Sequence, residues 1–122
     1  MRFKLLRNWR RVTVTLLVLA GGLHAYESFV LIDGPPSLGW FAWGWAPYSW
    51  CLLALLSVNG LPAAAGSASG LVMDLLGHYA VFINPTSSTA ALVLLFIPVW
   101  NTLLFIPLPI LLVRWILARK KK

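Results

Sequence analysis

The feature that most constrains this chain is a long interior stretch without a basic residue. All ten lysines and arginines lie before Val12 or after Val113. The residues between are mainly apolar, and Leu38 to Ile83 carries a single formal charge, on Asp74. A soluble fold cannot cover so much apolar surface with so few charges, whereas lipid can solvate it. We therefore expect an all-α integral membrane protein, with one transmembrane domain over residues 1–122.

Composition argues against two other classes of protein. Hydrophobic residues make up 60% of the chain, which intrinsic disorder does not tolerate. The net charge of +7 is typical of nucleic-acid binding, but it is confined to the two ends and accompanies no groove-reading motif. We expect no nucleic-acid partner. The basic ends instead favour anionic lipid headgroups, and the residues expected to contact them are Arg7, Arg10, Arg11, Arg119 and Lys120.

Three clusters of Gly, Pro, Asn and Asp divide the apolar region at even intervals. They lie at residues 33–37, 59–62 and 84–88. Such clusters mark turns, and a membrane-spanning helix needs about 20 residues plus a short connection. The sequence therefore predicts four spans in an up-down bundle, at about residues 12–32, 38–58, 64–83 and 89–113.

The positions of the basic residues predict the orientation. An even number of spans returns the chain to its starting side, and basic flanks mark the cytoplasmic side. We expect both termini in the cytoplasm, with the protein in a bacterial inner membrane. Residues 1–11 are predicted to form a basic amphipathic helix on the inner leaflet, and residues 114–122 a basic tail. The N-terminus is similar to a signal peptide, but apolar sequence continues to Ile32, which favours an uncleaved first span.

The third span is the weakest of the four. Its seven large apolar side chains favour insertion by roughly 0.5 kcal/mol each, and a charged Asp74 opposes it by about 3 kcal/mol. The helix therefore needs neighbours. The alternative fold is two spans plus re-entrant or interfacial helices.

Aromatic residues crowd the start of the second span. They can form an interfacial aromatic belt, or a surface for a lipid or a protein partner. The residues concerned are Trp40, Phe41, Trp43, Trp45, Tyr48 and Trp50.

Five polar side chains inside the predicted spans are the candidate functional site, because ionisable groups in lipid are costly. At a rise of about 1.5 Å per residue all five fall in one layer, near the bilayer centre and toward its outer half. They are His24, Glu27, Asp74, His78 and Asn101. We predict a contact between His24 or Glu27 on the first helix and Asp74 or His78 on the third. If the layer is structural, Asp74→Asn should be tolerated.

Small residues and prolines add two expectations about packing. The glycines of the first and third spans, Gly21, Gly22, Gly66 and Gly70 among them, can let these two helices approach closely. In the fourth span, Pro98 should kink the helix, and Pro107 and Pro109 should end it. Cys51 is the only cysteine, so an intrachain disulfide is impossible.

Three functions fit these features. The leading one is a non-catalytic accessory or assembly subunit of a larger membrane complex, whose partners are other membrane subunits or copies of itself. The alternative is a small homo-oligomeric transporter or channel for protons or cations that uses the polar layer. The third is a membrane metal or haem protein with His24 and His78 as ligands. The first two need no cofactor, and no catalytic motif is present in the sequence.

Overall fold

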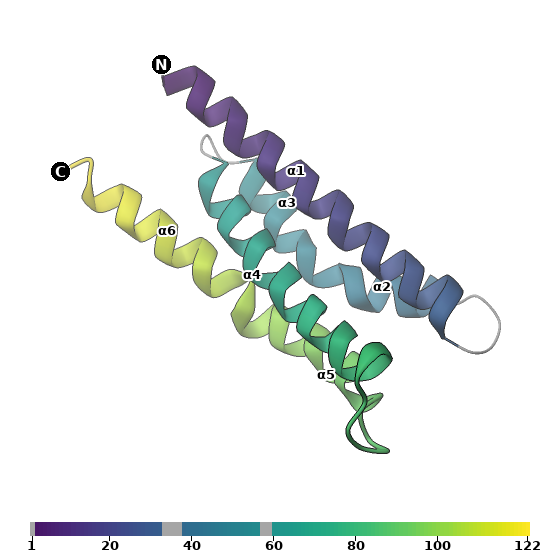
Figure 1. Ribbon diagram of the computed structural model, residues 1–122. Coiled ribbons are helices and arrows are strands. Elements are labelled where there is room, and N and C mark those ends of the chain that lie inside the picture. Colours follow the sequence, from purple (N-terminus) through teal and green to yellow (C-terminus); the bar gives the residue numbers. More distant parts are fainter. Residues whose placement is uncertain (1, 33–37, 57–59) are drawn as a thin grey trace.

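The computed structural model describes residues 2–32, 38–56 and 60–122, and all the regular structure in these ranges is helical (Figure 1). The chain begins with α1 (Arg2–Tyr26), which continues into a π-helical turn, η1 (Glu27–Leu31). Residues 2–11 form the first turns of α1 without a break, instead of a separate surface helix. The predicted turn at 33–37 and part of the one at 59–62 lie outside the described residues.

The second helical segment is bent, where the sequence predicted one straight span. It consists of α2 (Leu38–Trp45), a short 3₁₀ helix η2 (Ala46–Tyr48) and α3 (Ser49–Leu55). The break coincides with Pro47, which has no N–H and whose ring opposes the carbonyl of the preceding turn. Positions 57 and 58 of the predicted span lie outside the described residues.

The third and fourth segments are long. The third is α4 (Leu61–His78) followed by a π-helical turn, η3 (Tyr79–Ile83). It is one continuous helix of 23 residues, unlike the short pieces of a re-entrant segment. The fourth comprises α5 (Leu92–Trp100), the π-helical turn η4 (Asn101–Phe105) and α6 (Pro107–Arg119).

The prolines of the fourth segment act differently from the prediction. Pro98 lies inside α5, as expected for a distorted helix. Pro107 begins α6 rather than ending the helix. A proline is tolerated in the first turn of a helix, where its missing N–H has no intrahelical partner to lose. The π-helical turn before it closes with the N–H of Ile106 donating to the carbonyl of Asn101 at 3.1 Å.

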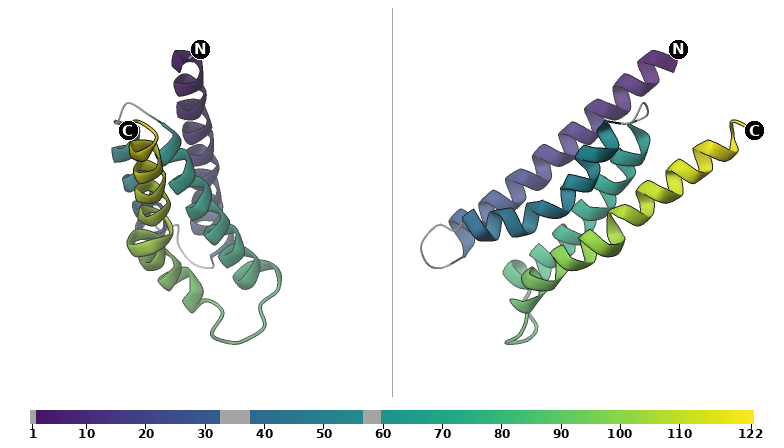
Figure 2. Two further views of the ribbon diagram at one scale, coloured as in Figure 1. Left: turned by 90° about the vertical axis from the view of Figure 1, so that its left-hand side faces the viewer. Right: turned by 180° about the vertical axis from the view of Figure 1, so that it is seen from behind.

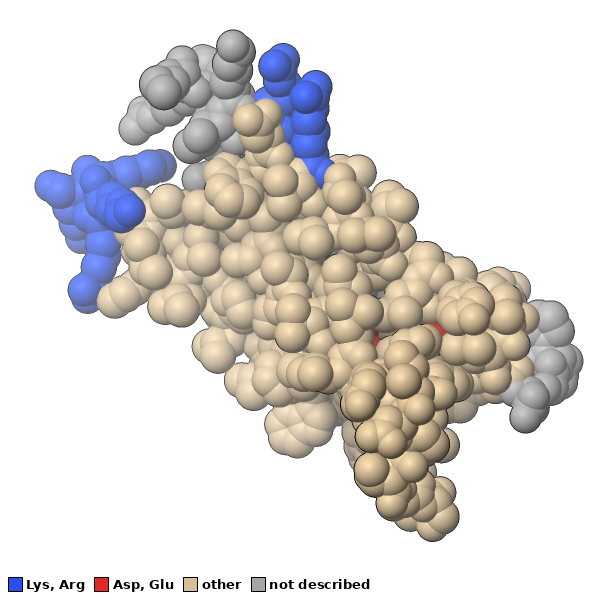
Figure 3. Space-filling view, viewed as in Figure 1, with Lys and Arg blue, Asp and Glu red and all other residues tan. Residues whose placement is uncertain are grey.

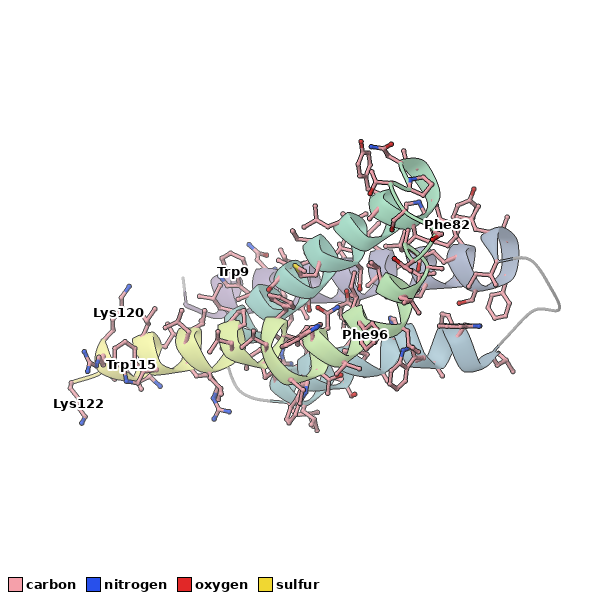
Figure 4. All side chains as sticks on the ribbon, turned by 90° about the horizontal axis from the view of Figure 1, so that it is seen from below. Trp9, Phe82, Phe96, Trp115, Lys120 and Lys122 are labelled. Atoms are coloured by element: carbon pink, nitrogen blue, oxygen red, sulfur yellow. The ribbon has the colours of Figure 1, made fainter. Side chains whose placement is uncertain are left out.

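The four segments run alternately up and down, and the described chain ends lie at the same end of the bundle (Figures 1 and 2). The basic side chains gather at that end, which we call the basic end (Figure 3). We call the opposite end, which contains residues 84–91, the loop end. Figure 4 places Trp9, Trp115 and Lys120 toward the basic end and Phe82 toward the loop end. In the part of the chain that the structure describes, three helices are long and apolar enough to cross a membrane: Arg7–Leu31, Leu61–Ile83 and Leu92–Arg119.

The third segment is the inner helix of the bundle, which explains how it tolerates its polar residues. Its buried residues are mostly small: Pro62, Ala63, Ala64, Gly66, Ser67, Gly70, Asp74 and Gly77. Small side chains let neighbouring helices approach closely. α4 packs against α1, as expected, but also against α3, α5 and α6.

The glycines face other neighbours than the sequence suggested. A Cβ on Gly66 would lie 2.7 Å from Cγ1 of Ile110, and one on Gly70 would lie 2.7 Å from Cγ1 of Ile106. Both glycines therefore accommodate the fourth segment and not α1. Gly21 on α1 faces the indole of Trp45 on α2.

Candidate functional site

The carboxylate of Asp74 is where all four helical segments meet. Three donors converge on it. Nε2 of His24 on α1 lies 2.9 Å from Oδ2, and the Tyr48 hydroxyl from η2 donates to the same oxygen. Nδ2 of Asn101 from η4 donates to Oδ1 at 3.0 Å. Asp74 itself lies on α4, so one acidic side chain is bound to all three of the other segments.

A second set of contacts extends this cluster toward the loop end. Nδ1 of His24 lies 3.4 Å from Oε2 of Glu27, one helical turn further along the first segment. The other oxygen of Glu27, Oε1, lies 2.8 Å from Nδ1 of His78 on α4. The predicted contact between the first and third helices is thus confirmed twice, by His24 with Asp74 and by Glu27 with His78.

We refer to His24, Glu27, Tyr48, Asp74, His78 and Asn101 together as the polar cluster. Tyr48 and Asn101 are fully buried. His24, Glu27 and Asp74 are buried to within a few per cent, whereas the His78 side chain is 16% exposed. His78 is therefore the member of the cluster with the greatest access to the surroundings. In Figure 3 the acidic residues are visible only as small areas between other atoms.

Distorted backbone surrounds the cluster. Glu27 and Asn101 each begin a π-helical turn, and His78 directly precedes one. The N–H groups of Ile32, Asn84 and Ile106 each donate to the carbonyl five residues earlier. Such turns are rare and occur often at functional sites. Each turn inserts one extra residue into the helical repeat, and the three turns lie at or next to Glu27, His78 and Asn101.

Two further features fit the cluster between the helices. Gly44 on α2 is buried against the His24 ring, and a Cβ there would lie 2.8 Å from Cε1 of His24. A cavity of about 20 Å³ lies between the segments, and its lining includes Glu27, Asp74, His24 and Ser28. A space of this size accommodates about one water molecule.

Tyr48 is the cluster residue that the sequence assigned elsewhere, to the aromatic belt. Its depth was a usable signal, because it lies near the middle of the second segment, at the level of the polar layer. What the sequence could not supply was the direction of its ring. The break at Pro47 turns Tyr48 inward, where its ring also contacts that of His24 at a centroid distance of 6.2 Å.

The other aromatic residues have several environments. Nε1 of Trp43 donates to the carbonyl of Leu95, three residues before Pro98, at 3.1 Å. Nε1 of Trp50 donates to the carbonyl of Thr102 at 3.0 Å. Ile106 donates to Asn101 and Pro107 has no N–H, so the Trp50 indole binds a carbonyl that lacks a normal helical donor. Phe41 and Trp45 stack on each other at 6.3 Å, and Trp40 is partly exposed.

The basic side chains that the structure describes at the chain ends, from Arg7 to Arg11 and from Arg114 to Lys122, are exposed. Arg10 donates to the carbonyl of Leu55 at 3.1 Å, which joins α1 to the end of α3. The Arg119 guanidinium lies over the Trp115 ring, 3.8 Å from its centroid. Arg7, Arg11 and Lys120 are exposed at the same end of the bundle.

His24 and His78 are the predicted ligands of a metal or haem, and His24 is already in contact with other side chains. Among the described residues, no three His, Cys, Asp or Glu side chains are grouped as ligands for one ion. Both ring nitrogens of His24 already face carboxylates. Ligation by His24 would therefore break a contact to Asp74 or Glu27.

Comparison with protein-family models, with curated proteins and with solved structures found no match.

Proposed function

We propose that this chain is an integral protein of a bacterial inner membrane whose four helical segments cross the bilayer, with both termini in the cytoplasm. Three long apolar helices support this placement, as does the confinement of basic residues to one end. The exterior supports it as well, because large apolar side chains are exposed along the whole bundle. Examples are Val18 at 68% exposure, Leu103 at 69% and Leu111 at 60%.

Within that setting, the function that the geometry supports best is a non-catalytic subunit of a larger membrane complex. The observation that carries this proposal is the contrast between interior and exterior. The described acidic and histidine side chains, His24, Glu27, Asp74 and His78, lie between the segments and contact one another, so they hold the segments together. The outer surface offers lipid and protein partners an almost continuous apolar face.

The alternative, a transporter or channel for protons or cations, is favoured by one observation. Hydrogen bonds and close contacts connect Asp74, His24, Glu27 and His78 without interruption. Toward the basic end, however, the described interior contains apolar side chains such as Leu17, Ala63 and Ile110. The buried hydroxyls on that side, Thr13 and Ser67, donate to backbone carbonyls. A single copy therefore offers a polar path through only part of the bundle.

The two functions are distinguished by what the protein assembles with. The untagged chain is extracted from its own membranes in mild detergent, captured with an antibody to the basic tail, and analysed by native mass spectrometry. We expect a complex with other membrane subunits at one fixed stoichiometry. A symmetric oligomer of this chain alone would favour the transporter, and a monomer alone would contradict both.

A further inference from the structure

The polar cluster contains three contacts between a histidine nitrogen and a carboxylate oxygen, and two neutral histidines have only two ring N–H protons for them. Three histidine nitrogens face carboxylate oxygens: Nε2 and Nδ1 of His24, and Nδ1 of His78. A neutral imidazole carries one N–H, and its other nitrogen presents a lone pair. A lone pair facing a carboxylate oxygen is repulsive, so each of these contacts requires a proton. Two neutral histidines supply two protons, and the geometry therefore requires a third.

The distribution of hydrogen bonds places that third proton on His24. Asp74 accepts from Tyr48 and Asn101 in addition to His24, which is the environment of an ionised carboxylate. Glu27 faces two histidine nitrogens. His24 lies between the two acids, so a proton on each of its ring nitrogens satisfies its contacts to both Asp74 and Glu27. With two carboxylates and one imidazolium, the cluster has a net charge of −1.

Nothing else in the interior can neutralise this charge. No lysine or arginine lies between Val12 and Val113. Among the described residues of the first segment, the titratable groups that face His78 are Glu27, whose Oε1 lies 2.8 Å from Nδ1 of His78, and Tyr26, whose ring centroid is 6.5 Å away. Asp74 and Tyr79 lie on its own segment, and the described residues of α2, α5 and η4 contain no titratable side chain.

One position remains where the cluster can gain a proton. Nε2 of His78 has no hydrogen-bond partner among the described residues, and His78 is the most exposed member of the cluster. Its ring lies near the loop end, 5.2 Å from that of Phe82. Protonation there changes the net charge of the buried cluster from −1 to 0, and a buried cluster without net charge costs less free energy than a charged one.

We propose that the polar cluster is a proton-binding site, which holds three protons in its histidine–carboxylate contacts and takes up a fourth reversibly at Nε2 of His78 from the loop end. This site goes beyond the subunit role proposed above and does not depend on it. It requires no path through the bundle, because uptake and release occur at the same end.

The protonation of the two histidines tests this directly. The full chain is labelled with ¹⁵N-histidine, reconstituted in lipid bilayers and followed by solid-state NMR as the pH is lowered. The protein has only two histidines, so four ring nitrogens report the whole site. We expect three protonated nitrogens and one unprotonated nitrogen near neutral pH, and four protonated nitrogens in acid. A spectrum with two unprotonated nitrogens near neutral pH would overturn the proposal, as would an unprotonated nitrogen that does not respond to acid.

The His78→Asn variant assigns these signals, because it leaves His24 as the only histidine, and the amide can still donate to Glu27. We expect two protonated His24 nitrogens at every point between near-neutral and acidic pH. An unprotonated His24 nitrogen would place the third proton elsewhere and contradict the proposal. Diethyl pyrocarbonate, which acylates accessible unprotonated imidazole nitrogens, checks access in the unmodified protein. His78 should react and His24 should not, and the reverse order would refute His78 as the point of uptake.

Discussion

At the scale of single residues, Asp74 determines how the bundle tolerates a charge in its interior. An acidic residue in an apolar span is costly, and three donors from three different segments compensate for it. The sequence correctly indicated that Asp74 needs partners, and it identified His24 and Asn101 as residues at a matching depth. Because three donors converge on its carboxylate, replacing Asp74 should affect stability more than the sequence suggested.

Asp74→Asn should destabilise the protein, although a structural role suggested from the sequence that it would be tolerated. An amide is neutral, so the contacts from His24 and Tyr48 lose their charged acceptor, even where the Asn101 amide turns to accept from the new NH₂ group. We expect a loss of about 2 kcal/mol in the free energy of unfolding, measured by detergent-induced denaturation. Tyr48→Phe is the matched control, because Asp74 keeps two donors. Its loss should stay below about 1 kcal/mol, and an equal loss in both variants would contradict the special position of Asp74.

At the scale of helical elements, the polar cluster depends on closely packed helices and on local breaks in them more than on the length of each helix. α4 is the least apolar of the long helices, and its small buried residues let it pack in the middle of the bundle. Pro47 breaks the second segment and turns Tyr48 inward. Trp43 and Trp50 join that segment to the carbonyls of the fourth. The weakly apolar α4 and the broken second segment therefore contribute the central residues of the polar cluster, Asp74 and Tyr48.

The contact between α4 and the fourth segment can be tested with a pair of glycines. An alanine Cβ at Gly66 would lie 2.7 Å from Cγ1 of Ile110 and 3.1 Å from the backbone oxygen of Ile106. Overpacking of this kind costs about 1–3 kcal/mol, which exceeds the gain in helix propensity of about 1 kcal/mol. Gly66→Ala should therefore lower the midpoint of thermal unfolding.

Gly22→Ala is the control for this experiment. Gly22 lies inside α1, and among the described residues no atom beyond its own stretch of helix is within 4 Å of the Cβ that alanine would add. Only the gain in helix propensity remains, so this variant should be as stable as the wild type or slightly more stable. If Gly66→Ala stabilised the protein as much as Gly22→Ala, the close packing of α4 against Ile106 and Ile110 would be wrong.

At the scale of the whole molecule, charge separates the two ends of the bundle. The basic end contains the described chain ends and the exposed arginines, and the loop end contains no basic residue. This asymmetry supports the proposed orientation, because lysine and arginine stay on the cytoplasmic side of a membrane. The buried polar cluster lies away from the basic end, and His78 is near the loop end.

Cysteine labelling can test the orientation without a large fusion partner. The native Cys51 is fully buried and serves as an internal control that should not react. Ser88→Cys at the exposed loop end should react with a membrane-impermeant maleimide in intact cells once the outer membrane is opened. Lys122→Cys should react only after the inner membrane is permeabilised. Labelling of both positions before that step would contradict the proposed topology.

The helical character of the chain, the places of three long helices and the shared level of the polar residues could be predicted from the sequence. These properties depend on composition and on distance along a helix, and both can be read in one dimension. The predicted boundaries were least accurate at prolines. Pro107 begins a helix where an end was expected, because its effect depends on the π-helical turn that precedes it.

Which side chains meet could not be predicted from the sequence, because it depends on how the helices pack. The direction of a side chain depends on the rotation of each helix about its axis, and that rotation is set by packing against three neighbours at once. For this reason Gly66 and Gly70 face the fourth segment rather than the first, although their spacing fits either. Tyr48 likewise belongs to the polar cluster rather than to the aromatic belt, because the break at Pro47 turns it toward Asp74.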